Sequence, residues 1–197
     1  MSTRLKRVCV YCASSPGTNA DITAATRELG RLLVQHDIEL VYGGGTVGLM
    51  GVVADTVMEA GGTVTGVIPT QLFPTEIAHR GISELVEVGS MHERKTKMFE
   101  LSDAFIALPG GFGTLEEIAE VTTWAQIGVH RKPVGLLNVD GYYDPLLAWL
   151  ERAIRDGLLK PTAANLLLHA TDPGSMLQTL RKYEPAPREA RMNLRET

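Results

Sequence analysis

The sequence predicts an α/β fold in which a mainly parallel sheet carries helices on both faces. The first observation is that short apolar runs alternate with helix-length amphipathic segments, which is the pattern of β-α-β units. The second is that runs such as FIAL and VGLL are continuously apolar, as expected where helices cover both faces of a parallel strand. The third is a length of 197 residues without a linker or a repeat, which predicts one domain over 1–182.

The first half of the chain supplies four expected strands and three expected helices. The strands are expected at 8–12, 38–42, 63–68 and 85–88, and the helices at 21–36, 47–60 and 91–101. The first helix is predicted because apolar residues recur at helical spacing over 22–33. Gly61 and Gly62 end the second helix, and Pro69 stops the third strand. The segment 71–81 has no periodic pattern and is expected to be irregular.

The second half continues the alternation. Strands are expected at 104–108, 134–138 and 166–169, and helices at 114–128, 143–156 and 174–182. The residues 183–197 contain two prolines and few apolar side chains, so they are expected to form a mobile tail outside the domain.

Composition excludes several classes of protein. Lys plus Arg is 19 and Asp plus Glu is 23, and a net charge of −4 argues against a nucleic-acid partner bound by a broad basic surface. No apolar run reaches the roughly 18 residues of a membrane helix, and the first apolar run is too short for a signal peptide. No membrane association and a cytoplasmic location are therefore expected. The five histidines are scattered, so no metal is expected. Cys9 and Cys12 would point to opposite faces of one strand, which predicts two separate buried thiols.

Three expected strands end in turns of small residues that can hold an anion. These turns contain Ser14, Gly44 with Gly45, and the run that starts at Gly110. Glycine lets backbone N–H groups approach a phosphate at a helix N-terminus, and open parallel sheets bind ligands at these strand ends. A tight strand-to-helix turn is the alternative for any single loop. The segment 43–48 matches G-x-G-x-x-G, but the next strand ends without an acidic residue, so no dinucleotide cofactor is expected.

Two charged residues are candidates for the same site. Glu117 follows Thr114 at the spacing of a capping box, so it is either a helix cap or a carboxylate that faces the ligand. Arg94 stands at the start of another helix, where it is either a solvated charge or an anion clamp. Arg94 and Glu117, arriving from adjacent strand ends, would give one cleft a cation and a carboxylate.

Longer motifs give the chain a specific resemblance. The run 109–117 reads PGGFGTLEE, which matches PGGxGTxxE in full. Further matches are GGGTVGLMG at 43–51, MHERK at 91–95, and the stretch from TWAQIG to GYYD at 123–144. Together these runs resemble the LONELY GUY (LOG) family of cytokinin riboside 5′-monophosphate phosphoribohydrolases over roughly 8–180.

The resemblance implies a Rossmann-like sheet, a homodimer and no cofactor. It also implies cleavage of the N-glycosidic bond of a purine ribonucleoside 5′-monophosphate, either AMP or an N6-prenylated adenine ribotide, to free base and ribose 5-phosphate. By the motifs, Arg94 and Glu117 are the catalytic pair. The implied substrate contacts are Gly110, Gly111, Phe112, Gly113, Thr114, Leu115 and Glu116, together with Glu76, Lys95 and Thr123. An apolar run at 48–58 is expected to supply a dimer interface.

The residues fit this chemistry, and two alternative functions remain to be considered. Hydrolysis at an anomeric carbon passes through an oxocarbenium-like state, which a carboxylate can stabilise while an arginine offsets phosphate charge or assists the departing base. Similar sequences have also been called lysine decarboxylases, which would need pyridoxal phosphate on a lysine; Lys95 and Lys97 are expected on an exposed basic helix without a motif for that cofactor. The other rival is a non-catalytic nucleotide or cofactor carrier on the same sheet.

Overall fold

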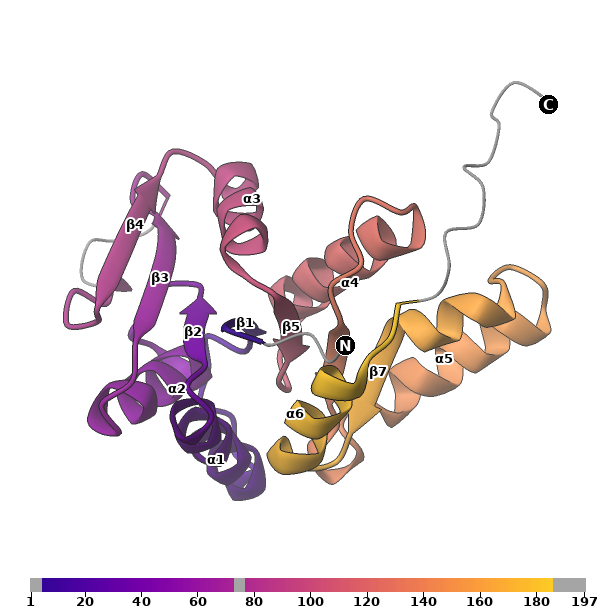
Figure 1. The fold of residues 1–197 in the computed structure, drawn as a ribbon, viewed down its shortest axis with the longest axis horizontal. Helices are drawn as coiled ribbons and strands as arrows, with labels where there is room; N and C mark the ends of the chain where they lie inside the picture. The colour runs from indigo at the N-terminus through magenta and orange to yellow at the C-terminus, as the bar shows by residue number, and fades with distance from the viewer. Residues whose placement is uncertain (1–4, 73–76, 186–197) are drawn as a thin grey trace.

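A single seven-stranded sheet organises the protein in the computed structural model, which describes residues 5–72 and 77–185. The strand order is β4-β3-β2-β1-β5-β6-β7, and every neighbouring pair is parallel (Figure 1). The strands are β1 (Arg7–Tyr11), β2 (Glu39–Tyr42), β3 (Val64–Pro69), β4 (Glu84–Val88), β5 (Ala104–Ala107), β6 (Val134–Leu137) and β7 (Leu167–Ala170). The expected fold class is confirmed, and all seven expected strands are present with ends displaced by at most two residues.

Six α-helices of the described residues cover the two faces of this sheet. They are α1 (Ala20–Gln35), α2 (Gly48–Glu59), α3 (Met91–Leu101), α4 (Phe112–Gln126), α5 (Asp144–Arg155) and α6 (Pro173–Lys182), with 3-10 turns at Val139–Gly141 and Pro161–Leu166. Helices α1, α2 and α6 bury their apolar side chains in one cluster, and α3, α4 and α5 in another. Figure 1 shows the two groups on opposite sides of the strands.

The two cysteines show how the sheet divides the core. Cys9 belongs to the cluster beneath α3 and α4, whereas Cys12 belongs to the cluster beneath α1 and α2. Both are buried free thiols, and burial raises the pKa of each far above the usual range of a thiol. The prediction of two separate buried thiols is therefore confirmed, and neither is a reactive thiolate near neutral pH.

Much of the apolar run at 48–58 is buried inside the protein, so its hydrophobicity does not require an interface, and an interface there stays a prediction. Leu49, Val53, Ala54 and Val57 are buried in the core beside α1. A helix that packs between a sheet and a neighbouring helix needs an apolar stripe wider than that of a surface helix. The hydrophobicity of α2 therefore reflects its burial in this protein.

The order of the strands determines where a ligand can bind. From β1 the chain moves outward through β2, β3 and β4, and it then returns to place β5 on the other side of β1. The crevice beyond the carboxyl ends of β1 and β5 is thus the topological switch point, where open parallel sheets bind ligands. The turns after β1, β2 and β5, which contain the three candidate anion loops, all lie at this end of the sheet.

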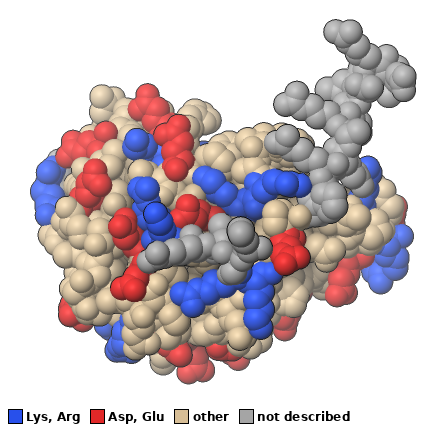
Figure 2. Space-filling model, in the orientation of Figure 1, with Lys and Arg blue, Asp and Glu red and all other residues tan. Residues whose placement is uncertain are grey.

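The surface carries charges of both signs. Lys and Arg side chains lie among Asp and Glu side chains on the face shown in Figure 2. Among the described residues, no helix is both long and apolar enough to cross a membrane. Helix α6 ends at Lys182, and 183–185 follow without regular structure, while 186–197 of the expected tail lie outside the described residues.

Candidate active site at the carboxyl ends of the strands

Arg94 is held by main-chain oxygens at the strand ends. Helix α3 begins after Ser90, whose hydroxyl caps the amide of Glu93, and Arg94 lies in its first turn. The Arg94 Nε donates to the carbonyl of Val67 at 3.1 Å, and its Nη2 donates to the carbonyl of Gly43 at 3.2 Å. The residue is 8% exposed, so the alternative of a solvated surface charge is wrong.

Gly43 makes this position of the guanidinium possible. A Cβ atom on Gly43 would lie 1.9 Å from the Nη2 of Arg94, much closer than non-bonded atoms approach. The first glycine of the 43–45 run is therefore required by the arginine side chain.

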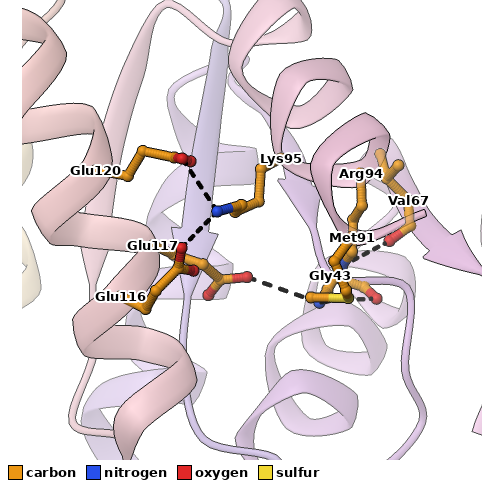
Figure 3. A network of polar contacts seen from close by, with 8 residues as sticks. All are labelled: Gly43, Val67, Met91, Arg94, Lys95, Glu116, Glu117 and Glu120. Atoms are coloured by element: carbon orange, nitrogen blue, oxygen red, sulfur yellow. Dashed lines mark hydrogen bonds and ion pairs between the residues drawn. The ribbon is translucent and has the colours of Figure 1, made fainter. Parts of the chain in front are cut away.

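Glu117 faces Arg94 from the neighbouring helix. The Oε1 of Glu117, on α4, lies 3.7 Å from the Nη1 of Arg94, and the two side chains are 9% and 10% exposed (Figure 3). Burial raises the pKa of Glu117 from 4.5 to about 7, and the Arg94 charge acts in the opposite direction. A carboxyl group with this pKa exists in both protonation states near neutral pH, which suits a group that exchanges a proton during a reaction.

The capping box expected at Thr114 and Glu117 is not formed. Helix α4 begins two residues earlier than expected, with Gly111 as its N-cap, so Thr114 already lies inside the first turn. Gly110 leaves room for Thr114 in this arrangement, because a Cβ on Gly110 would lie 2.1 Å from the Thr114 hydroxyl oxygen. Glu117 consequently lies in the second turn, too far along the helix to act as its cap.

The N-terminus of α4 is open. No side chain of the described residues caps its amides. Gly111 and Gly113 are exposed, and a Cβ on either would meet nothing within 4 Å. Free amides and the positive end of the helix dipole together favour an anion at this position. Phe112, 93% exposed, and Leu115, 43% exposed, flank these amides with apolar surface.

Lys95 links α3 to α4 next to Arg94 and Glu117. Its ammonium group donates to the carboxylate of Glu116 and, at 3.0 Å, to that of Glu120 (Figure 3). Lys95 is buried and Lys97 is half-buried, so the expectation of an exposed basic helix is wrong at Lys95. Burial acts to lower the pKa of Lys95, but the hydrogen bonds to the two carboxylates outweigh it, and the pKa is raised. This lysine is therefore a fixed cation.

The remaining expected substrate contacts that the structure describes lie in the turns after β1 and β2 and further along α4. Ser14 is exposed in the turn after β1, which packs against Gly48 at the start of α2. Gly44 and Gly45 are buried and pair with 77–79, since the Gly44 carbonyl accepts from the His79 amide at 2.9 Å. These contacts fix the loop against 77–79. Thr123 is exposed further along α4, where its hydroxyl donates to the Ala119 carbonyl. The position of Glu76 lies outside the described residues.

The structure adds residues to the site that were not among the expected catalytic and substrate-binding residues. Gly43 could have been found, because it opens the glycine run that follows an expected strand. Glu120 could also have been found from its spacing of four after Glu116, which places both on one face of α4. The Val67 carbonyl and the Met91 thioether, 3.9 Å from the Nη1 of Arg94, carry no sequence signal. No group of three or more metal-ligating side chains occurs in the part of the chain that the structure describes.

Fold and site together define a Rossmann-like α/β protein in which an open helix N-terminus lies beside a buried acidic group. The family model described as "Possible lysine decarboxylase" matches 50–180 of the chain. A "Probable cytokinin riboside 5'-monophosphate phosphoribohydrolase" of Oryza sativa subsp. japonica is 51% identical over 96% of this chain and 77% of that protein. A "Cytokinin riboside 5'-monophosphate phosphoribohydrolase" of Arabidopsis thaliana is 50% identical over 92% and 84%. The chain belongs to the family of these cytokinin riboside 5'-monophosphate phosphoribohydrolases, so the resemblance to LOG proteins is confirmed.

Solved structures share the architecture at lower identity. The molybdenum cofactor binding protein from Rippkaea orientalis is 24% identical with a TM-score of 0.67, over 90% of this chain and 96% of that chain. The Moco carrier protein from Chlamydomonas reinhardtii is 23% identical with a TM-score of 0.67, over 91% and 97%. At these identities the likeness shows the fold alone.

Proposed function

We propose that the chain is a hydrolase that cleaves the N-glycosidic bond of purine ribonucleoside 5′-monophosphates, including N6-substituted adenine ribotides of the cytokinin type. The observation that carries the proposal is the buried Arg94–Glu117 pair beside the open N-terminus of α4. Glu117 follows Phe112 by five residues, which is about 7.5 Å along a helix. A 5′-phosphate on the amides of 111–113 would thus direct its ribose toward Glu117.

The reaction needs one water and no other reactant. The bond between C1′ and the base nitrogen breaks, the oxygen of water bonds to C1′, and the base leaves with a proton. The Glu117 carboxylate would stabilise the positive charge that develops at C1′ and accept the proton of the attacking water. That proton then passes to the departing base, which regenerates the carboxylate. Arg94 would hold this carboxylate in place, since its other nitrogens are fixed by carbonyls.

The geometry does not favour lysine decarboxylation. Pyridoxal phosphate forms its imine with a lysine that must lose its proton, whereas Lys95 is a fixed cation between Glu116 and Glu120. Lys132 has a pKa lowered by burial, but it lies just before β6, at the opposite end of the strands from the site. Neither lysine fits that cofactor at the strand ends.

We also propose a homodimer that uses the surface of α4 and α5. Helix α5 has no fully buried residue although its apolar side chains lie on one face. Trp149 on α5, Ile127 at the end of α4, and Leu158 after α5 are 63%, 68% and 83% exposed. Large exposed apolar side chains on neighbouring segments are typical of a protein–protein interface.

The experiment compares each monophosphate with its nucleoside. Charge-assisted hydrogen bonds contribute roughly 1.5–3 kcal/mol each, so loss of two at the helix N-terminus costs at least about 3 kcal/mol. We expect kcat/KM for adenosine and isopentenyladenosine to be at least about 100-fold below that of their monophosphates. Equal values would show that the glycine turn at α4 does not recognise phosphate.

A further inference from the structure

Two successive tyrosines hold the segment that leads from β5 into α4. The Tyr142 hydroxyl donates to the carbonyl of Gly110 at 2.7 Å, and the Tyr143 hydroxyl donates to the carbonyl of Leu108 at 2.6 Å. The two rings contact each other edge to face, with centroids 5.1 Å apart. Side chains from the turn after β6 therefore fix the main chain of the turn after β5.

The turn that presents these tyrosines is itself well anchored. The Asn138 side chain accepts from the Tyr143 amide at 2.6 Å and donates to the Asp144 carboxylate at 2.8 Å. Asp140 accepts from the Asn19 side-chain amide at 3.0 Å, which joins this turn to the start of α1. The Tyr142 hydroxyl is therefore carried by a fixed turn and can position Gly110.

The two hydroxyls differ in what they can contribute. Tyr143 is 6% exposed, so removal of its hydroxyl leaves a buried carbonyl without that donor and lowers stability. Tyr142 is 46% exposed, and water can replace its hydrogen bond at little cost to the fold. The bond from Tyr142 to Gly110 is therefore explained poorly by stability alone.

The carbonyl of Gly110 and the N–H of Gly111 belong to one peptide group. A donor on the carbonyl polarises that group, fixes its plane and makes the N–H a stronger donor toward an anion. Gly111 is the N-cap of α4, next to the open amides. We propose that Tyr142 is a positioning residue for recognition of the 5′-phosphate, acting through the Gly110–Gly111 peptide. This inference rests on the proposed function and adds a specificity-determining residue to it.

The test uses Tyr142→Phe with Tyr143→Phe as the matched variant, because each removes one hydroxyl from the same segment. In Tyr142→Phe we expect kcat/KM for AMP to fall about 3- to 10-fold, while that for adenosine changes less than about twofold. The inhibition constant of ribose 5-phosphate should rise by the same factor, and that of adenine should stay constant. In Tyr143→Phe we expect a lower Tm with an unchanged ratio between AMP and adenosine.

An unchanged AMP-to-adenosine ratio in Tyr142→Phe would overturn the inference, whatever the change in Tm. An equal fall for both substrates would also overturn it, because that result indicates a structural role only. If the wild-type protein releases no base from AMP, the proposed function fails instead. Titration calorimetry with AMP and adenosine then still decides the role of Tyr142, since the variant must weaken AMP binding selectively even without turnover.

Discussion

The protonation of Glu117 makes stability depend on pH in a direction opposite to that of most carboxylates. Burial raises its pKa to about 7, so between pH 4.5 and 7 the folded protein keeps a proton that the unfolded chain releases. The free energy of unfolding of the wild type therefore falls as pH rises through this window. Glutamine has nearly the same shape and does not titrate, so Glu117→Gln should lack this loss.

The size of the effect follows from the raised pKa. A pKa of about 7 in place of 4.5 corresponds to about 3 kcal/mol in total, at about 1.4 kcal/mol for each pKa unit. Roughly 2–3 kcal/mol of this falls between pH 5 and pH 8. For a protein of this length, that change moves Tm by about 5–10 °C. We therefore expect the Tm of Glu117→Gln, measured relative to that of the wild type, to rise by this amount between pH 5 and pH 8.

The assay is urea unfolding of both proteins at pH 5, 6, 7 and 8. The comparison uses the difference between the two proteins at each pH, so the constant cost of removing the partner of Arg94 cancels. Parallel stability curves would refute the reasoning, because they would mean that Glu117 titrates near its ordinary value. If the stability of Glu117→Gln relative to the wild type increased as pH falls, even the predicted sign of the pH dependence would be wrong.

Three further predictions concern the neighbours of Glu117 and the assembly. Arg94→Lys should keep the fold but have a much lower kcat/KM for AMP than the wild type, because a lysine ammonium cannot bind both carbonyls and face Glu117. Arg80→Lys, at an exposed arginine, is the control and should leave kcat/KM unchanged. Gly43→Ala should lower kcat/KM at least about 10-fold by displacing the guanidinium, whereas Gly81→Ala, where a Cβ meets nothing nearer than 3.5 Å, should not. Light scattering at micromolar concentration should give a dimer of 21.4 kDa chains and a monomer for Trp149→Glu; a monomeric wild type would contradict the proposed interface.

Much of the fold could be predicted from the sequence because its signals are local. Continuous apolar strands, helical spacing and glycine or proline stops gave every strand and α-helix, and α3 was predicted with its observed bounds. The start of α4 was predicted two residues late, because Thr-x-x-Glu is the usual cap and the close packing of Thr114 on Gly110 is a three-dimensional fact. The same limit applies to α2, whose apolar residues were expected at an interface and whose burial against the core the sequence did not indicate.

The site was predicted unevenly for a related reason. Arg94 and Glu117 lie on motifs, and the structure brings them together. The acceptors of Arg94 are main-chain oxygens of β3 and the turn after β2, which any residue type supplies and which a sequence cannot mark. Lys95 looked exposed because its carboxylate partners lie on another helix. Gly44 was expected to offer its N–H to an anion, and the structure adds that its carbonyl accepts from the His79 amide, a contact that no motif indicates.

The most direct test of the account is base release by the purified protein, with Glu117→Gln as the matched variant. AMP and isopentenyladenosine 5′-monophosphate are incubated with each protein, and free base and ribose 5-phosphate are separated by chromatography. We predict equal amounts of the two products from the wild type, and a rate at least about 100-fold lower in the variant. Intact nucleotide after prolonged incubation with the wild type, or equal rates in the two proteins, would contradict the assignment of Glu117 as the catalytic carboxylate of a nucleotide N-glycosidase.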